Sequence, residues 1–456
     1  MERLRTAKQK IALLLALALL PVCGCAGWNK PVSSVQEQSA SSRQETSSGR
    51  VPDDKPAWEE VSSHSTFSNQ VSTSVPQVQT PFACAEMRLE YEKLPNQATR
   101  QAYDAMLKAV STITSSRNDR GEYRTASVLL EGISLSEREL RLALSAMRSD
   151  NPQIFWITNR FGYDSDTRRG TVVELYSYYS AKECGQRIQK LAQAVRKMCS
   201  VLNGNQPVFS RELALHDALL ASVTYDGEAA GSAENPEPFT AYGALVEGKA
   251  VCQGYALAMK LLLCYAGIES TVISGASQGV AHAWNAVLLD EEWYYLDATW
   301  NDAEQRIRYD YFNITSEVLQ IDHMVDPVYP GEGGEEQYNL WLPECPAVPL
   351  NYFNRCAVYL NGFDEENDQR LLARLQSMLA ASSTMLAIRF DSSMDYEESV
   401  SMLITDQPYK LIYLMQRANQ SYGSVNRFAM EDIQYTKAKG QNAVTIWLRL
   451  DSFQEP

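Results

Sequence analysis

A helix followed closely by a tight hairpin is the pattern that most constrains how this chain can fold. Over residues 253 to 266, apolar side chains recur at offsets of four, seven and eight, which places them on one face of a helix. These side chains are Leu257, Leu261, Cys264 and Tyr265. Gly267 then ends the helix. Residues 280 to 289 and 292 to 299 predict two strands with a tight turn at Asp290-Glu291, and so short a link requires antiparallel pairing.

The helix and the hairpin carry three side chains that can do chemistry together. Cys252 stands at the start of the helix, where the dipole and free N–H groups stabilise a thiolate and can form part of an oxyanion hole. With a two-residue turn, His282 pairs with Thr299, and Asp297 lies two residues away on the same face. A thiol, an imidazole and a carboxylate in this order predict a nucleophile, a base and an orienting group.

Each of these residues also has an ordinary structural explanation. A single cysteine at a helix start is more often a small buried hydrophobe, and a single strand histidine is usually structural. The joint pattern favours function, because the chain has only 4 histidines to choose from. Of the others, His64 lies in a polar tract and His216 lies on an apolar helical stripe, which predicts a core position. We expect His323 to lie in a loop, where it is the only rival base.

These motifs resemble those of the transglutaminase-like superfamily, in its bacterial branch. The resemblance covers roughly residues 206 to 320. The matching residues are Cys252, Gly254, Tyr255 and Ala256; His282, Ala283, Trp284 and Asn285; and Asp297, Thr299, Trp300 and Asp302. The resemblance implies a papain-like α+β core with Cys252 as nucleophile, His282 as base and Asp297 as its orienting group. Tyr255, Trp284 and Trp300 are the candidates for substrate contact, although aromatic residues near a hairpin are about as often core.

The resemblance does not imply a single reaction. Its members include cross-linking enzymes, peptidases, deamidases and proteins that have lost activity. For this chain we expect attack on an amide bond of a peptide or protein, with the acyl group passing from a thioester to water. Transfer of the acyl group to an amine is the second expectation, and a non-catalytic binding module that keeps the fold is the third. The intact set of three residues counts against the third.

The start of the chain predicts export and a lipid anchor. Basic residues precede the apolar run 11 to 20, the layout of a secretory signal, and Val22-Cys23-Gly24-Cys25 resembles a bacterial lipoprotein cleavage box with Cys25 as the lipidated residue. Residues 1–25 are thus the signal and lipobox. Residues 26–82 are rich in Ser, Thr and Pro, which predicts a disordered tether. The folded part would then lie on the extracellular face of the bacterial membrane, within reach of cell-wall peptide.

The rest of the chain predicts two α+β regions around the catalytic domain, which we place at residues 206–326. The region 83–205 shows helical patterns at 98 to 112, at 136 to 148 and at 184 to 202, with a strand expected at 154 to 157. The helix at 136 begins with the capping-box spacing of Ser136 and Glu139. A small domain of unknown role, 345–456, follows a Gly- and Glu-rich boundary. Its expected elements lie at 356–360, 371–379, 385–390, 411–416 and 443–450.

Charge and cysteine usage limit the partners further. A net charge of −15 argues against binding to nucleic acid and against a polybasic surface that would bind anionic membranes. No Cys/His grouping has zinc-ligand spacing and no glycine-rich phosphate loop occurs, so we expect no metal and no cofactor. Without Cys23, Cys25 and Cys252, an even number of cysteines remains, which permits disulfides without requiring them. We expect Cys264 to be a core residue.

Overall fold

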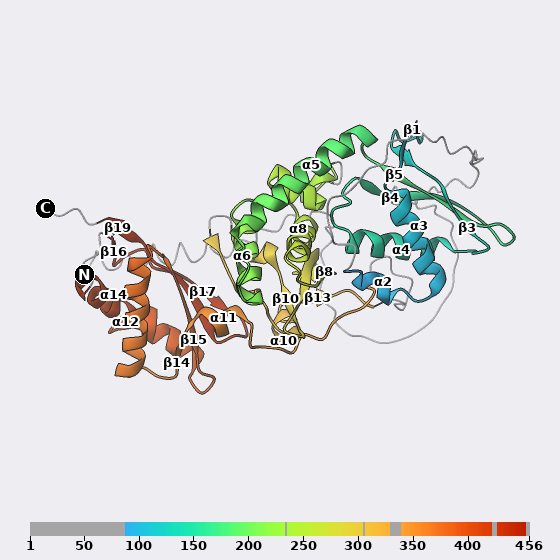
Figure 1. Ribbon diagram of the computed structural model, residues 1–456. Helices are drawn as coiled ribbons and strands as arrows, with labels where there is room; N and C mark the ends of the chain where they lie inside the picture. Colours follow the sequence, from blue (N-terminus) through green and yellow to red (C-terminus); the bar gives the residue numbers. More distant parts are fainter. Residues whose placement is uncertain (1–86, 233–234, 304–305, 329–338, 422–425, 453–456) are drawn as a thin grey trace, which may run out of the picture.

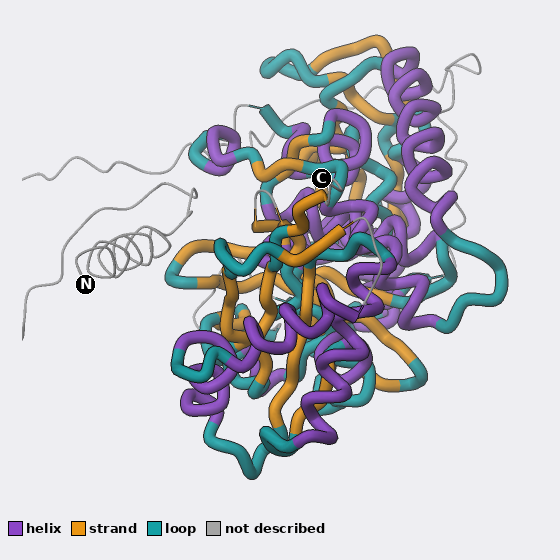
Figure 2. Tube along the Cα trace, turned by 90° about the vertical axis from the view of Figure 1, so that its left-hand side faces the viewer, coloured by secondary structure: helices purple, strands orange, loops and turns teal. Residues whose placement is uncertain are grey.

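The computed structural model describes residues 87–232, 235–303, 306–328, 339–421 and 426–452. Figure 1 shows three parts in a row: an N-terminal region, a central part and a C-terminal domain. Figure 2, turned by 90°, views this row from the end of the C-terminal domain. Helices and strands mix in each part, which confirms the α+β class. Among the described residues, no helix combines the length and the apolar character needed to cross a bilayer.

The N-terminal region is an antiparallel sheet covered by helices. Strand β5 lies at its centre and pairs with β2, β3 and β4. The elements are α2 (Leu89–Lys93), α3 (Gln97–Ala109), β1 (Ile113–Arg117), β2 (Tyr123–Thr125), β3 (Val128–Glu131), α4 (Glu137–Asp150), β4 (Ile157–Asp166), β5 (Gly170–Ser177), α5 (Ala181–Met198) and η2 (Cys199–Val201).

The predicted helices of this region are present, but the strand expected at 154 to 157 begins later. Ser136 and Glu139 form the predicted capping box at the start of α4. Residues 154 to 156 form a buried turn, and only residue 157 belongs to β4. The apolar side chains of this turn pack in the hydrophobic core, and the buried Trp156 indole N–H finds a partner in the Val110 carbonyl at 3.1 Å. A run of apolar residues marks burial here and does not distinguish a strand from a packed turn.

A buried polar cluster joins the N-terminal region to the central part. Glu90 of α2 donates its backbone N–H to the carboxylate of Asp150 (3.0 Å) and accepts a hydrogen bond from the hydroxyl of Thr271 in β8. The ammonium of Lys260, on helix α8, lies 3.7 Å from Asp150, and both side chains are almost completely buried. Charges removed from water in this way require partners, and each part supplies partners for the other.

The central part packs helix α8 on one face of an antiparallel sheet of order β10-β9-β8-β13. Residues 287 and 289 of β9 join the hydrophobic cluster that contains α8, whereas 284 and 286 join a second cluster, as alternating strand side chains must. The elements are α6 (Val208–Leu220), β6 (Thr224–Tyr225), α7 (Gly227–Ala230), η3 (Glu237–Phe239), η4 (Gly243–Glu247), β7 (Lys249–Ala250), α8 (Cys252–Tyr265), β8 (Ser270–Ser277), β9 (Val280–Leu289), β10 (Glu292–Leu296), α9 (Ala298–Asn301), β11 (Asp302–Ala303), β12 (Arg306–Ile307), α10 (Ser316–Leu319) and β13 (His323–Val325).

The β9–β10 hairpin has the predicted register but ends earlier than expected. Asp290 and Glu291 form the turn, both at positive φ, and Leu289 pairs with Glu292. Pairing stops at Leu296, so the expected pairing of His282 with Thr299 is wrong. The strand ends there because the Asp297 side chain accepts from the Trp300 N–H at 3.0 Å and caps α9.

The C-terminal domain has its own core around a sheet of order β14-β15-β18-β17. Strands β14 and β15 are parallel and the other pairs are antiparallel. Helices or strands lie at the five expected places. The elements are α11 (Tyr352–Cys356), β14 (Val358–Leu360), α12 (Glu365–Ala380), β15 (Met385–Phe390), α13 (Tyr396–Val400), η5 (Ser401–Thr405), α14 (Lys410–Ser421), β16 (Asn426–Phe428), β17 (Gln434–Ala438), β18 (Ala443–Trp447) and β19 (Leu450–Ser452).

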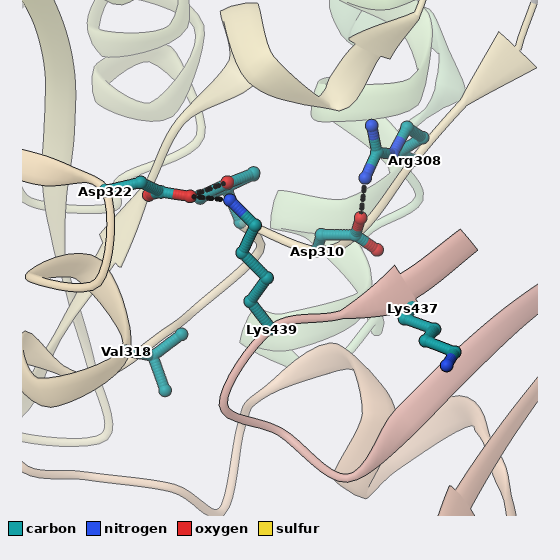
Figure 3. A pocket seen from close by; sticks show the side chains of 7 residues that line it. Arg308, Asp310, Val318, Asp322, Lys437 and Lys439 are labelled. Atoms are coloured by element: carbon teal, nitrogen blue, oxygen red, sulfur yellow. Dashed lines mark hydrogen bonds and ion pairs between the residues drawn. The ribbon is translucent and has the colours of Figure 1, made fainter. Parts of the chain in front are cut away.

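The β17–β18 hairpin of this domain contacts the central part. The Lys439 ammonium lies 3.0 Å from an Asp322 carboxylate oxygen, and the Gln441 amide donates to the Asp310 carbonyl at 2.8 Å. Figure 3 shows the small polar pocket at this contact, in which Lys439 meets Asp322 and Arg308 meets Asp310. Asp322 and Asp310 already have cationic partners. We therefore interpret the pocket as part of the interface between the central part and the C-terminal domain.

Candidate active site

Cys252 is the first residue of α8 and is 7% exposed. The loop before it is held close, because the Val251 N–H donates to the Pro238 carbonyl at 3.0 Å. The same carbonyl explains the glycine two positions after the cysteine, since a Cβ on Gly254 would lie 2.3 Å from it. The sequence motif around Cys252 therefore fixes the backbone at the start of the helix.

Two hydrogen bonds tie the first turn of α8 to the elements that carry the other predicted groups. The Asn285 amide on β9 donates to the Ala256 carbonyl at 3.0 Å, and the Tyr255 hydroxyl donates to the carboxylate of Asp302, just after α9. Helix α8 also packs against β9 and α9. The helix that begins with Cys252 is thus held against the strand of His282 and the short helix that Asp297 caps.

His282 and Asp297 form a direct hydrogen bond. The His282 Nε2 atom lies 2.6 Å from Asp297 Oδ2, and the Asp297 side chain is completely buried. The Asp297 backbone N–H donates to the Tyr311 carbonyl at 3.0 Å, and its second carboxylate oxygen caps α9. Backbone and side chain are both fixed, so Asp297 presents one defined acceptor to the imidazole.

This hydrogen bond decides which ring nitrogen of His282 can act as a base. Because Asp297 accepts, the proton of a neutral imidazole resides on Nε2, which leaves the lone pair on Nδ1. Burial would raise the pKa of Asp297, but the charge and hydrogen bond of His282, followed by those of His323, outweigh burial and hold it well below its usual range. A carboxylate that stays ionised can stabilise an imidazolium when His282 gains a second proton.

His323 also contacts Asp297. It was expected in a loop, but it is the first residue of β13 and pairs with Ser277 of β8. That pairing brings His323 Nε2 to 3.1 Å from Asp297 Oδ2, the atom that His282 also contacts. Nδ1 of His323 lies 2.8 Å from Asp322 Oδ1. The sequence identified His323 only as a rival base, and no local signal connects it to a residue so far back along the chain.

The predicted substrate-contact residues differ in exposure. Tyr255 and Trp284 are buried, and Trp284 stacks on His282 with ring centroids 5.8 Å apart. Trp300 is partly exposed and meets His282 edge-on, with ring centroids 6.4 Å apart. Tyr255 and Trp284 are thus packed inside the protein, whereas part of the Trp300 side chain is exposed to solvent. Their contact with a substrate stays a prediction.

Among the described residues, one grouping has donor atoms spaced closely enough for an ion. The atoms belong to His282, Asp297 and His323 and lie within 4.8 Å of one another. Both imidazoles already direct Nε2 to Asp297 Oδ2, so hydrogen bonds account for the spacing. We therefore assign no metal to these residues.

The remaining predicted residues have separate outcomes. His216 is fully buried, as predicted, and hydrogen-bonds to Asp217 and Asn301. The core prediction for Cys264 holds in part, because its side chain packs against the main hydrophobic core but is partly exposed and disulfide-bonded. The end of an amphipathic helix is also a site at which a disulfide can tie the helix to another segment. Cys25 and His64 lie outside the described residues.

Comparison with known proteins covers the centre of the chain. A model of the transglutaminase-like superfamily matches residues 196–298, a segment that includes Cys252, His282 and Asp297. No curated protein matches the sequence.

Several solved structures are similar, at low identity. One is described as a TGase (14% identity, 43% of this chain and 55% of that chain covered, TM-score 0.24). Another is a candidate cysteine protease from Cytophaga hutchinsonii (16% identity, 31% and 61% covered, TM-score 0.21). A third is the periplasmic domain of TgpA from Pseudomonas aeruginosa (14% identity, 41% and 72% covered, TM-score 0.18). With 55% and 61% of the first two spanned and TM-scores this low, the likenesses carry no argument about activity.

The family match and the geometry concern the same residues. The matched segment contains the start of α8 and the β9–β10 hairpin with the residue that follows it. The transglutaminase-like core expected from the motifs is thereby confirmed. Residues 196–298 of this chain thus form a transglutaminase-like domain.

Proposed function

We propose that this chain is an exported cysteine enzyme that cleaves amide bonds of peptides or proteins. The superfamily consists mostly of enzymes that use a cysteine. The observation that carries the proposal is the 2.6 Å hydrogen bond between His282 and the buried carboxylate of Asp297, on elements packed against the helix that begins with Cys252. Desolvating the ionised Asp297 carboxylate costs several kcal/mol, and the hydrogen bonds from its histidine partners offset this cost.

The proposed reaction assigns one step to each group. Nδ1 of His282 takes the thiol proton, and the Cys252 sulfur adds to the carbonyl carbon of the substrate. N–H groups at the start of α8 can stabilise the oxyanion. The imidazolium then gives its proton to the leaving amine as the C–N bond breaks, and an acyl thioester remains on Cys252. Water, activated by His282, attacks this thioester, releases the acid and restores the thiol.

The proposed location is the extracellular face of the bacterial membrane, through a lipid on Cys25. Support comes from the signal and lipobox pattern of the sequence. The disulfide at Cys264 adds support, because disulfides persist in oxidising compartments and are rare in the cytosol. Peptides or proteins outside the cell, cell-wall peptide among them, are therefore the proposed substrates. The net charge of −15 argues against nucleic acid.

Trapping of the acyl group tests the proposal directly. The protein is mixed with a library of peptides and wall fragments, acid-quenched, and digested under conditions that preserve thioesters. We expect mass spectrometry to find an acyl adduct on Cys252, absent in Cys252→Ala and reduced in His282→Ala. Cys199, another buried thiol, is the internal control. Absence of any adduct together with retained binding of a library member would favour the non-catalytic binding module.

A second arm separates hydrolysis from amine transfer. A primary amine is added to the same reaction, and the products are analysed for free acid and for amide. We expect the acid to dominate, as hydrolysis requires. Predominant formation of the new amide would replace hydrolysis by acyl transfer while leaving the roles of the three residues intact.

A further inference from the structure

His323 lies between two carboxylates. Its Nδ1 is 2.8 Å from Asp322 Oδ1 and its Nε2 is 3.1 Å from Asp297 Oδ2, and its side chain is completely buried. The two acceptors belong to different elements, since Asp297 caps α9 and Asp322 directly precedes β13. The family match ends at residue 298, so it does not extend to His323.

The two hydrogen bonds determine the charge of the ring. A carboxylate can only accept, and a neutral imidazole has a single N–H to donate. Two carboxylate partners therefore require both nitrogens to carry protons, which makes His323 an imidazolium. Burial would lower the pKa of His323, but the hydrogen bonds and charges of Asp297 and Asp322 outweigh burial and raise the pKa to about 9.

The groups around His323 agree with a fixed positive charge. Asp322 is itself held as an anion: burial opposes this, but hydrogen bonds from His323, Tyr311 and Lys439 lower its pKa to about 2. The ring of His282 faces His323 with centroids 5.6 Å apart. The remaining aromatic neighbours of His323 are Trp284, Trp300 and Tyr311. These rings limit water at the site, so charges there interact more strongly than at the surface.

We propose that His323 is a positioning residue of the active site, an imidazolium that fixes the Asp297 carboxylate and sets a positive charge beside His282. The inference rests on the proposed roles of Cys252 and His282. It assigns His323 no contact with the substrate. A site of this kind has two histidines on one carboxylate: one exchanges protons, and the other stays protonated.

The fixed charge has a definite electrostatic sign. A positive charge beside the proposed Cys252–His282 pair favours the deprotonated form of the thiol, so it should lower the pKa of Cys252. Removal of the charge should therefore raise the pKa of the Cys252 thiol. If His323 were purely structural, its replacement would change the stability of the protein and leave the pH dependence of thiol labelling unchanged.

The test compares two matched variants of the purified protein. His323→Gln removes the charge but keeps an N–H that can reach Asp297. His216→Gln is the control, because His216 is equally buried and also directs Nδ1 to the aspartate next in sequence, at 3.0 Å. Iodoacetamide labelling of Cys252 is followed by peptide mass spectrometry across pH. This readout needs no substrate.

We expect the midpoint of Cys252 labelling to move to higher pH by about one unit in His323→Gln and to stay fixed in His216→Gln. Below the midpoint, the labelling rate of His323→Gln should thus fall about tenfold. If the midpoint is unchanged in His323→Gln while the wild-type thiol is reactive, the role of His323 is overturned and the proposed function is unaffected. If wild-type Cys252 reacts no faster than a free thiol, the proposed function itself fails.

A measurement on the unaltered protein covers the case in which His323→Gln does not fold. In ¹⁵N-histidine spectra, both ring nitrogens of His323 should carry protons throughout the neutral range. The signals are assigned by comparison with His216→Gln and His282→Gln. A His323 ring that loses a proton at or below neutral pH would overturn the inference.

Discussion

Asp297 is the residue at which the two histidines meet, and its charge can be removed with little change in size. In Asp297→Asn, the amide no longer holds the proton of His282 on Nε2 by charge, and the wrong tautomer becomes available. We expect turnover to fall by up to ~10⁴-fold, the size found for an orienting aspartate in serine proteases, while the fold is kept. Turnover is measured on a substrate found by acyl trapping.

Asp290→Asn is the matched control for this change. Asp290 is exposed in the turn of the same hairpin at φ 49°, a conformation that asparagine tolerates. Asp302 is a poor control, because its carboxylate accepts from Tyr255 and helps to fix the first turn of α8. Normal turnover in Asp297→Asn would remove Asp297 from the site.

The free thiols allow a second prediction at the residue scale. Burial raises the pKa of Cys184 to about 12, of Cys199 to about 11 and of Cys345 to about 12. We expect Cys252 at a helix start to alkylate much faster than these thiols at mildly acidic pH, as judged by quantitative peptide mass spectrometry. The rate should fall in His282→Ala. Equal alkylation rates for all four thiols would show that Cys252 is an ordinary buried side chain and not an activated nucleophile.

Strand β8 controls the spacing of the elements that bear the histidines. Gly275 pairs with His282 on one side and with Val325 on the other. A Cβ at this position would lie 2.2 Å from the Met324 carbonyl and 2.5 Å from the Trp284 ring. We expect Gly275→Ala to lower the free energy of unfolding by ~1–3 kcal/mol, because β13 or Trp284 must move.

Gly185→Ala is the companion change, measured by the same denaturant titration. Gly185 lies inside α5, and a Cβ there would meet no atom within 4 Å. Alanine should therefore stabilise the helix by up to ~1 kcal/mol. An equal change in the free energy of unfolding for both variants would show that the close contacts at Gly275 do not require a glycine.

Glu90 gives a prediction on how the N-terminal region docks onto the central part. Burial raises the pKa of Glu90 to about 7, against the attraction of Lys260 and the hydrogen bond from Thr271. The folded state then holds a proton that the unfolded state releases above its ordinary pKa of about 4.3. Because of Glu90, the free energy of unfolding should decrease as pH rises from about 4.3 to 7, and the decrease should be complete above pH 7.

Glu90→Gln isolates this contribution, because the amide oxygen can still accept from Thr271. Relative to wild type, the variant should gain roughly 1–3 kcal/mol in free energy of unfolding between pH 5 and pH 8. Denaturant titrations at the two pH values measure the difference. A stability difference that stays constant between them would show that Glu90 is ionised in the folded protein.

The expected anchor belongs to the whole molecule. Labelling of cells with a fatty-acid probe should mark this protein, and Cys25→Ser should abolish the label, because that thiol is the predicted acceptor. Cys23→Ser is the adjacent control and should retain the label. Labelling that survives Cys25→Ser would contradict the anchor assignment.

Short-range physics explains what the sequence by itself determined. The register of the β9–β10 hairpin follows from its two-residue turn, and the start of α4 follows from its capping box. The roles proposed for Cys252, His282 and Asp297 came from their order in elements that such local signals define. Turns and caps depend on neighbours a few residues away, and those neighbours are visible in the sequence.

Only the tertiary structure decided the contacts between distant segments. It ended β10 at Leu296, because Asp297 caps a helix that the strand pattern did not reveal. It placed His323 on Asp297 through the pairing of β13 with β8. It also joined Lys439 of the C-terminal domain to Asp322. Such contacts depend on how sheets and domains pack, and packing energy is spread over many residues that carry no local signature.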